Sequence, residues 1–260
     1  MRKVPAPKQR VDPECIFADA KRRALTPEEA GRLLARLPLF WWDHALCLLG
    51  TGLRFGEFAG LRAHRVHLDR AVPVVQVVDT RYQAGRFGSG FKPRPKSDAA
   101  IRELPLAPLV VDAIRRQLPP GNNPSALVFT GPGGGNGVPT GTRTTLSRHG
   151  LRRLYQSAIH RAGPDLAHLQ LRGPHDLRHS FSTWLEDAGI PARVIDELMG
   201  HQRSRHGELE GGSRIGARYR HTTPEMAARV VQALQARLMV ALQVAEEVSQ
   251  ADPGQRTRVF

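Results

Sequence analysis

The sequence predicts a mainly helical protein with a small three-stranded antiparallel sheet near its N-terminal third, an α+β fold. Over most of the chain, apolar residues recur at spacings of three and four, which is typical of helices that bury one face. Between residues 72 and 106 the pattern changes to valines and glycines, which is typical of short strands joined by turns. With 260 residues, 40% of them hydrophobic, the chain is long enough to bury a sizeable core.

The first helix is expected to begin at Pro27. Thr26 can act as its N-cap, Pro27 suits the first helical position, and Glu29 completes a capping box. Residues 1–24 are polar and basic and carry three prolines, so they are expected to form a linker or arm. One domain is therefore expected over residues 25–248, followed by a polar tail over residues 249–260.

Helical spacing, broken by glycine or proline, predicts further helices along the chain. They are expected over residues 41–49, 54–61, 108–118, 145–162, 175–188, 192–199 and 224–244. Gly50 and Gly52 should form a tight turn between the first two of these. Strands are expected around residues 74–78 and 101–106, with a glycine-rich turn over residues 85–90. The last helix is amphipathic, and we expect it to pack on its own domain.

The charge balance favours a polyanionic partner. Lys and Arg outnumber Asp and Glu by 38 to 24, a net charge of +14, and they are spread along the chain. This distribution favours nucleic acid over a membrane surface. No apolar run approaches the ~20 residues that span a bilayer, and no secretory signal is visible. Cys15 and Cys47 have no metal-like spacing, which fits a reducing cytoplasm.

Arg54 is the first candidate for chemistry. It follows a glycine-bearing turn at a predicted helix start, where free backbone N–H groups favour an anion. Glu57, three residues further on, can hold or cap this region. The alternative is an ordinary surface pair at i, i+3.

The segment His175-Asp176-Leu177-Arg178-His179 is the second candidate. On a helix, His175, Arg178 and His179 share one face, so a histidine and an arginine can address the same phosphate. The opposite face is apolar, so the polar face should not be needed for packing. An i, i+4 metal pair of His175 and His179 is disfavoured, because Asp176 is shorter than the glutamate of zinc peptidases and Arg178 would repel a cation.

Two further signals follow. Gly200 fits the residue after a helix and places His201 in a loop. Tyr219 lies between Arg218 and Arg220 and is followed by His221. A tyrosine so flanked is unlike a core residue, although it could stack on a nucleic-acid base. The glycine-rich stretch of residues 131–137 lacks the lysine and hydroxyl of a phosphate-binding loop and is interpreted as a flexible loop.

Taken in order, these motifs resemble the tyrosine recombinase and phage integrase family. The resemblance covers residues 25–244 and rests on these residues: Arg54, Lys96, His175-x-x-Arg178, Gly200-His201 and Tyr219-x-His221. It implies the mainly α catalytic-domain fold of DNA breaking-rejoining enzymes. It also implies a site-specific recombinase or integrase of a mobile element, which cleaves and rejoins DNA through a 3′-phosphotyrosyl intermediate.

The resemblance also implies a role for each residue. Arg54 and Arg178 would stabilise charge on the phosphate, and Tyr219 would attack it. His175 would act as acid or base, and Lys96, or Lys92 on the same hairpin, would protonate the leaving oxygen. His201 would bind a non-bridging oxygen or position the tyrosine, with Glu57 and His221 in support.

The same resemblance implies partners and location. It predicts no cofactor and no metal, double-stranded DNA as partner, a DNA-dependent homo-oligomer that is a tetramer on paired sites, and association with the bacterial nucleoid.

Two departures from the family pattern stand out. Seventeen residues separate His201 from Tyr219, which we interpret as a flexible insertion. The N-terminal core-binding domain is expected to be absent, so the chain would be a fragment or a natural short form. The rival functions are a type IB topoisomerase, an idle DNA-binding integrase remnant and, ranked lower, a basic RNA-binding protein.

Overall fold

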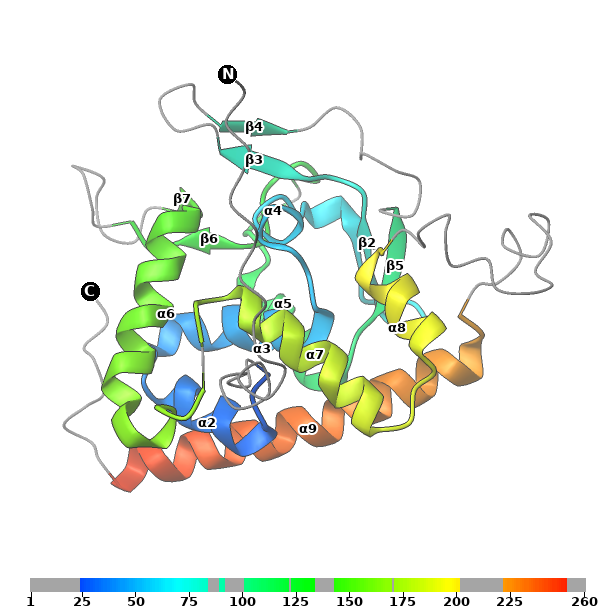
Figure 1. The fold of residues 1–260 in the computed structure, drawn as a ribbon. Helices are drawn as coiled ribbons and strands as arrows, with labels where there is room; N and C mark the ends of the chain where they lie inside the picture. The colour runs from blue at the N-terminus through cyan, green and yellow to red at the C-terminus, as the bar shows by residue number, and fades with distance from the viewer. Residues whose placement is uncertain are drawn as a thin grey trace, which may run out of the picture.

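The computed structural model describes residues 24–83, 89–91, 101–121, 123–133, 143–169, 171–201 and 222–251. The α-helices in these ranges are α2 (Pro27–Ala35), α3 (Trp42–Thr51), α4 (Phe55–Phe58), α5 (Pro108–Gln117), α6 (Arg148–Ala162), α7 (His175–Asp187), α8 (Ala192–Met199) and α9 (Pro224–Ala251). Short 3-10 helices are η1 (Leu39–Trp41), η2 (Ala63–Arg65) and η5 (Gly163–Asp165). The mainly α fold with small antiparallel sheets is confirmed (Figure 1).

The main sheet has three antiparallel strands in the order β1-β2-β5. They are β1 (Val66–His67), β2 (Val74–Val77) and β5 (Arg102–Pro105). Val75 pairs with Val66 on one side and with Leu104 on the other. Separate two-stranded ribbons join β3 (Arg81–Gln83) to β4 (Ser89–Phe91), and β6 (Thr130–Gly131) to β7 (Thr144–Thr145). The sheet has the predicted three strands, but β1 lies before the region in which they were predicted. A strand of two residues is too short to show the alternation of buried and exposed side chains, so the sequence did not reveal it.

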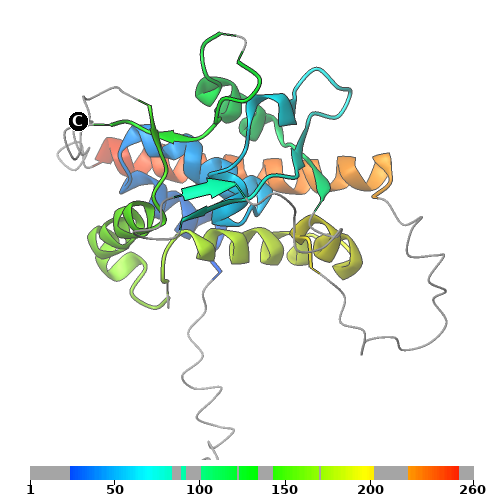
Figure 2. The same cartoon turned by 90° about the horizontal axis from the view of Figure 1, so that it is seen from above.

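Helix α3 lies at the centre of the fold. It contacts α5, α7 and α9, and every residue from His44 to Thr51 is buried. Figure 2 shows α7 and α9 running along opposite sides of this central helix. Leu177, Phe181, Trp184 and Leu185 of α7 are all buried, as the predicted core-facing stripe requires. The buried apolar side chains of α7 therefore hold this helix, including its first turn, against α3.

Helix α9 packs on its own domain, as predicted. It buries Val230, Leu234, Leu238 and Ala241 and lies along α2. A Cβ on Gly31 would lie 2.5 Å from the Ala241 carbonyl, so glycine lets α2 and α9 approach closely. The helix continues to Ala251, beyond the predicted end at residue 244, since Ala245 and Ser249 are also buried. The expectation that a polar tail begins at residue 249 is therefore wrong in its boundary.

The capping box at Thr26 and Glu29 is confirmed: the Thr26 hydroxyl accepts from the Glu29 N–H at 3.2 Å, and the Glu29 carboxylate accepts from the Thr26 N–H at 2.7 Å. The turn predicted from Gly50 and Gly52 belongs to Gly52 alone, whose φ of 59° ends α3. Gly50 is helical, and a Cβ there would lie 2.3 Å from Val110 Cγ2. Its role is close packing of α3 against α5.

Two other helix boundaries differ from the prediction. The helix predicted over residues 54–61 is the single turn α4, which begins after Arg54 as N-cap. The helix predicted from residue 145 begins at Arg148 with Ser147 as N-cap, because Thr144–Thr145 pairs with Thr130–Gly131. Most of the glycine-rich stretch 131–137 lies outside the described residues.

Candidate active site

Three segments that are distant in the sequence meet at one point: the turn between α3 and α4, the first turns of α7, and the C-terminal end of α8. Burial of α3 and α7 places the first two, and α8 packs back toward β5 (Figure 1). They bring together four of the predicted residues, Arg54, Glu57, Arg178 and His201, through the contacts given below. Helix ends therefore supply these four residues.

Gly200 ends α8 in the left-handed conformation, with φ 62° and ψ 42°. This turn exposes carbonyls that have no partner within the helix, and these accept from arginines. Arg102 Nε donates to the Leu198 carbonyl at 2.6 Å, Arg178 Nη2 to Met199 at 2.6 Å, and Arg54 Nη2 to Gly200 at 3.3 Å. Three successive carbonyls therefore hold three arginines from three segments.

Glu57 is buried beneath this end of α8 and is bound by two of the arginines. Its Oε2 accepts from the Arg54 N–H at 2.8 Å, and its Oε1 accepts from Arg54 Nη1 at 3.1 Å. Arg102 forms a bidentate pair with the same carboxylate, at 3.1 and 3.0 Å. Burial by itself would raise the pKa of Glu57, but hydrogen bonds and charge attraction from Arg102 and Arg54 hold it below its usual range. The alternative of an ordinary surface pair is wrong, because Glu57 is buried.

Arg178 is 3% exposed, so the polar face of α7 does take part in packing, contrary to the prediction. Its guanidinium also donates to the Gly52 carbonyl, which ties α7 to the α3–α4 turn. Burial lowers the pKa of Arg178 to about 9, and the positive charges of Arg54 and Arg102 contribute to this shift. Burial and the neighbouring arginines disfavour the charged form of Arg178, so an anion bound beside it would stabilise that form strongly.

His201 lies beside Arg178, with Nη2 and Nε2 3.3 Å apart, and its Nδ1 is 3.2 Å from Asp196 Oδ1. His175 is exposed at the first position of α7, and its ring meets that of His179 edge-on, with centroids 4.9 Å apart. Among the described residues, no group of three His, Cys, Asp or Glu side chains is arranged to hold a metal ion.

Lys96, with its fallback Lys92, and Tyr219 and His221 lie outside the described residues, as does the insertion before Tyr219. The described chain resumes at Thr222, whose N–H donates to Glu197 Oε1 at 3.3 Å. Glu197 is on α8, four residues before His201. The chain three residues after Tyr219 is therefore attached to the same helix end that carries the arginines.

Sequence reasoning assigned no role to two buried polar residues. Arg102 follows Lys96 by six residues, and its alternation with Leu104 on β5 is the signal that it points inward. Asp176, 1% exposed, accepts from the N–H groups of Arg172 and Gly173 and so fixes the turn that precedes His175. The sequence signal for Asp176 is an acidic residue in the first turn of a predicted helix.

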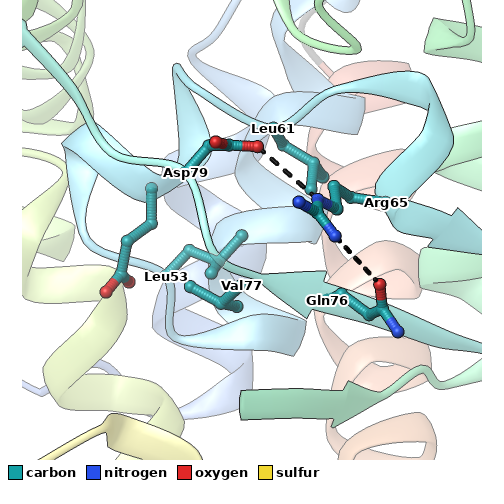
Figure 3. A pocket seen from close by; sticks show the side chains of 7 residues that line it. Leu53, Leu61, Arg65, Gln76, Val77 and Asp79 are labelled. Carbon is teal, nitrogen blue, oxygen red and sulfur yellow. Dashed lines mark hydrogen bonds and ion pairs between the residues drawn. The ribbon is translucent and has the colours of Figure 1, made fainter. Parts of the chain in front are cut away.

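A shallow recess next to Glu57 is closed by its own side chains. Arg65 crosses it, with Nε 3.6 Å from Asp79 Oδ2 and Nη1 3.5 Å from Gln76 Oε1 (Figure 3). It has no room for a water molecule, so it offers no ligand site.

In the described parts of the chain, no helix is both long and apolar enough to cross a membrane.

Comparison with known proteins shows one family. The sequence pattern of the phage integrase family matches residues 23–208, more than half of the chain. The tyrosine recombinase XerA of Thermococcus kodakarensis is 31% identical over 182 residues, which cover 69% of this chain and 54% of that protein. The tyrosine recombinase XerC of Neisseria gonorrhoeae is 32% identical over 168 residues, 63% of this chain and 45% of that protein.

Solved structures show the same fold. The Tn1549 transposon integrase in complex with transposon right end DNA superimposes with a TM-score of 0.57 at 20% identity, over 82% of this chain and 67% of that chain. The same integrase in complex with circular intermediate DNA gives 0.55 at 23% identity, over 83% and 68%. This chain spans about half the length of the curated relatives it matches.

Proposed function

Because this chain belongs to the phage integrase family, we propose that it is a site-specific DNA recombinase. It cleaves and rejoins double-stranded DNA through a covalent 3′-phosphotyrosyl link to Tyr219. The observation that carries the proposal is the meeting of Arg54, Arg178 and His201 at the end of α8. Two guanidinium groups at one point, with an imidazole beside them, form a site for a single phosphate.

The charge of the phosphate explains why two arginines are needed. A phosphodiester carries one negative charge and approaches two in its five-coordinate transition state, so fixed cations stabilise the transition state more than the ground state. Arg54 is 41% exposed along its side chain and can reach a ligand directly. Arg178 is buried and acts as the fixed member of the pair.

The cleavage step balances without a cofactor. Tyr219 Oη attacks the phosphorus, its proton passes to His175, and the bond from phosphorus to the 5′-oxygen breaks. Lys96 gives a proton to that oxygen, which leaves as a free 5′-hydroxyl. The phosphotyrosyl ester keeps the bond energy, so rejoining is the same step in reverse. The attachment of Thr222 to Glu197 supports this assignment, since three residues span at most ~11 Å.

The first turns of α6 provide a basic surface next to the site. Arg148, His149, Arg152 and Arg153 are exposed. The guanidinium of Arg148 lies 5.3 Å from the centroid of the Phe55 ring, directly after Arg54. Arg152 lies near Gly173, two residues before His175: a Cβ on Gly173 would lie 3.4 Å from Arg152 Cγ. Neighbouring DNA phosphates would bind along this surface.

Assembly and location are also proposals. We expect a DNA-dependent homo-oligomer, a tetramer on two paired sites, acting in the cytoplasm on nucleoid DNA. The relatives' names, recombinase and integrase, favour strand exchange over relaxation by a monomeric topoisomerase. The chain's half-length match to its relatives leaves room for a separate DNA-clamping domain, without which DNA affinity would fall.

The test uses a panel of candidate DNA sites, each prepared as a suicide substrate nicked close to the cleavage point. The protein should form a denaturant-stable adduct in the presence of a chelator, and Tyr219→Phe should not. A plasmid with two paired sites should then yield recombinant products. Supercoil relaxation without exchange would favour the topoisomerase, and DNA binding without any adduct would favour the idle remnant.

A further inference from the structure

The end of α8 holds its three arginines in different ways. Arg54 and Arg178 are the proposed phosphate ligands, whereas the side chain of Arg102 is only 4% exposed and has its guanidinium engaged within the protein. Its Nη1 and Nη2 donate to the two oxygens of Glu57, and its Nε donates to the Leu198 carbonyl. Arg102 therefore bridges α4 and α8 from β5.

The same Glu57 oxygens that bind Arg102 also bind Arg54. Oε1 accepts from Nη1 of both arginines, and Oε2 accepts from the Arg54 N–H and from Arg102 Nη2. Within the described residues, the Arg54 guanidinium makes one further hydrogen bond, to the Gly200 carbonyl at 3.3 Å. The location of Arg54 thus depends on Glu57, and the location of Glu57 depends on Arg102.

Charge repulsion makes this arrangement necessary. Three guanidinium groups share one helix end, and isolated cations would separate. The helix C-terminus carries partial negative charge, and the Glu57 carboxylate adds a full one. Arg102 contributes the two bonds that keep this carboxylate ionised and oriented in the interior.

We infer that Arg102 is a positioning residue for cleavage, which aligns Arg54 with Arg178 through Glu57 and the Leu198 carbonyl. The inference rests on the proposed function, because it concerns the same phosphate site. Because the Arg102 side chain is buried, we expect it not to touch DNA. Its loss should therefore slow the chemical step and leave DNA affinity unchanged.

The test uses single-turnover cleavage of the suicide substrate at saturating protein, with DNA affinity measured separately. Arg102→Lys keeps the charge but cannot form the bidentate pair. We expect the cleavage rate to fall roughly 10- to 100-fold, as for a small misplacement of a catalytic group, and the DNA Kd to change less than about twofold. Val75→Ala, on the neighbouring strand β2, is the control for lost core packing.

A second readout separates positioning from general damage. On a substrate whose scissile phosphate is an uncharged methylphosphonate, the transition state approaches one negative charge instead of two. Arg54 then has less charge to stabilise, so the ratio of wild-type to Arg102→Lys rates should be smaller than on the phosphodiester. Val75→Ala should give the same ratio on both substrates. The double variant Arg102→Met with Glu57→Met replaces a buried ion pair by apolar residues, which proteins often tolerate, so it should fold yet show the same loss.

The outcomes are distinguishable. Cleavage by Arg102→Lys and by the double-Met variant at the wild-type rate would overturn the inference while the proposed function stands. An equal loss on the charged and uncharged substrates would also overturn it, because that result indicates general destabilisation. If wild type forms no adduct on any DNA tested, both the proposed function and this inference fail.

Discussion

Arg178 Nη2 lies 3.3 Å from His201 Nε2, and this contact fixes the tautomer of the histidine. A guanidinium can only donate, so Nε2 accepts and the ring proton is on Nδ1, facing Asp196 Oδ1 at 3.2 Å. Asp196 therefore orients His201 in the way that outer carboxylates orient catalytic histidines.

Removal of Asp196 should slow cleavage through His201. We expect Asp196→Ala to lower the single-turnover rate roughly tenfold, about 1.4 kcal/mol in activation free energy. When Asp196→Ala is combined with His201→Ala, it should have almost no further effect on the rate, since both changes remove the same contact between Asp196 and His201. Asp112→Ala, which breaks an exposed pair with Arg115, is the control. Additive losses in the double variant would show that Asp196 acts independently.

The two proposed phosphate ligands should differ in what their removal costs. Arg54→Ala and Arg178→Ala should each slow cleavage by roughly 10²- to 10³-fold, as loss of one charge-stabilising donor does. Thermal unfolding should separate them. Arg54 is 41% exposed, whereas Arg178 is buried and satisfies the Gly52 and Met199 carbonyls. Arg178→Ala should lower stability by about 1–3 kcal/mol, and Arg54→Ala should lower it less. Equal stability loss in both variants would contradict this division.

Gly52 should be irreplaceable for two reasons. Its φ of 59° disfavours any side chain, and a Cβ would lie 2.5 Å from the ring of Phe181. We expect Gly52→Ala to lose about 1–2 kcal/mol for the backbone and a further ~1–3 kcal/mol for the clash. It should also slow cleavage, because its carbonyl holds Arg178.

Gly189→Ala is the matched control for Gly52. Its φ is 69° and nothing lies within 4 Å of its Cβ position, so only the backbone cost applies. Chemical denaturation and cleavage rates measure both effects. Equal loss of stability in the two variants would show that the Phe181 contact relaxes.

Stability should depend on pH through His44. This residue is fully buried among Phe40, Trp41, Phe58 and Phe129, and burial lowers its pKa from 6.5 to about 4. Between these values the unfolded chain binds a proton that the folded chain does not. Stability is therefore lost as pH falls through this window, by up to about 3 kcal/mol.

Urea unfolding at pH 7, 5.5 and 4 measures this dependence. His44→Phe should be less sensitive to pH than wild type across the window, and His160→Phe, which changes an exposed residue on α6, should follow wild type. Because acidic groups titrate alike in all three proteins, the difference isolates His44. The same pH slope in His44→Phe and wild type would refute the assignment.

Local sequence patterns correctly predicted those helix ends that depend on a few neighbouring residues. The capping box at Thr26, the helix over residues 192–199 and the glycine stop at Gly200 are each determined by a few neighbouring residues. Gly50 was misinterpreted because its reason is tertiary: it makes room for Val110, sixty positions away. No local rule separates a packing glycine from a turn glycine.

The candidate site shows the same limit. Motif order placed Arg54, Arg178 and His201 together, but it gave no indication that Arg178 is buried or that Arg102 completes the network. Both depend on where α8 ends in space, because the Leu198 and Met199 carbonyls are the acceptors. A contact between a side chain and a distant backbone carbonyl leaves no pattern in the sequence.

The chain has three tyrosines, and we propose that one of them, Tyr219, forms the covalent link. Tyr155 is fully buried, whereas Tyr82 is 42% exposed on β3 and makes a suitable control. The decisive measurement is mass spectrometry of the peptides from a nuclease-trimmed protein–DNA adduct. We expect a nucleotide joined through its 3′-phosphate to Tyr219, and an adduct that is retained in Tyr82→Phe and lost in Tyr219→Phe. A nucleotide on Tyr82 or on another residue, or an adduct that survives Tyr219→Phe, would contradict it.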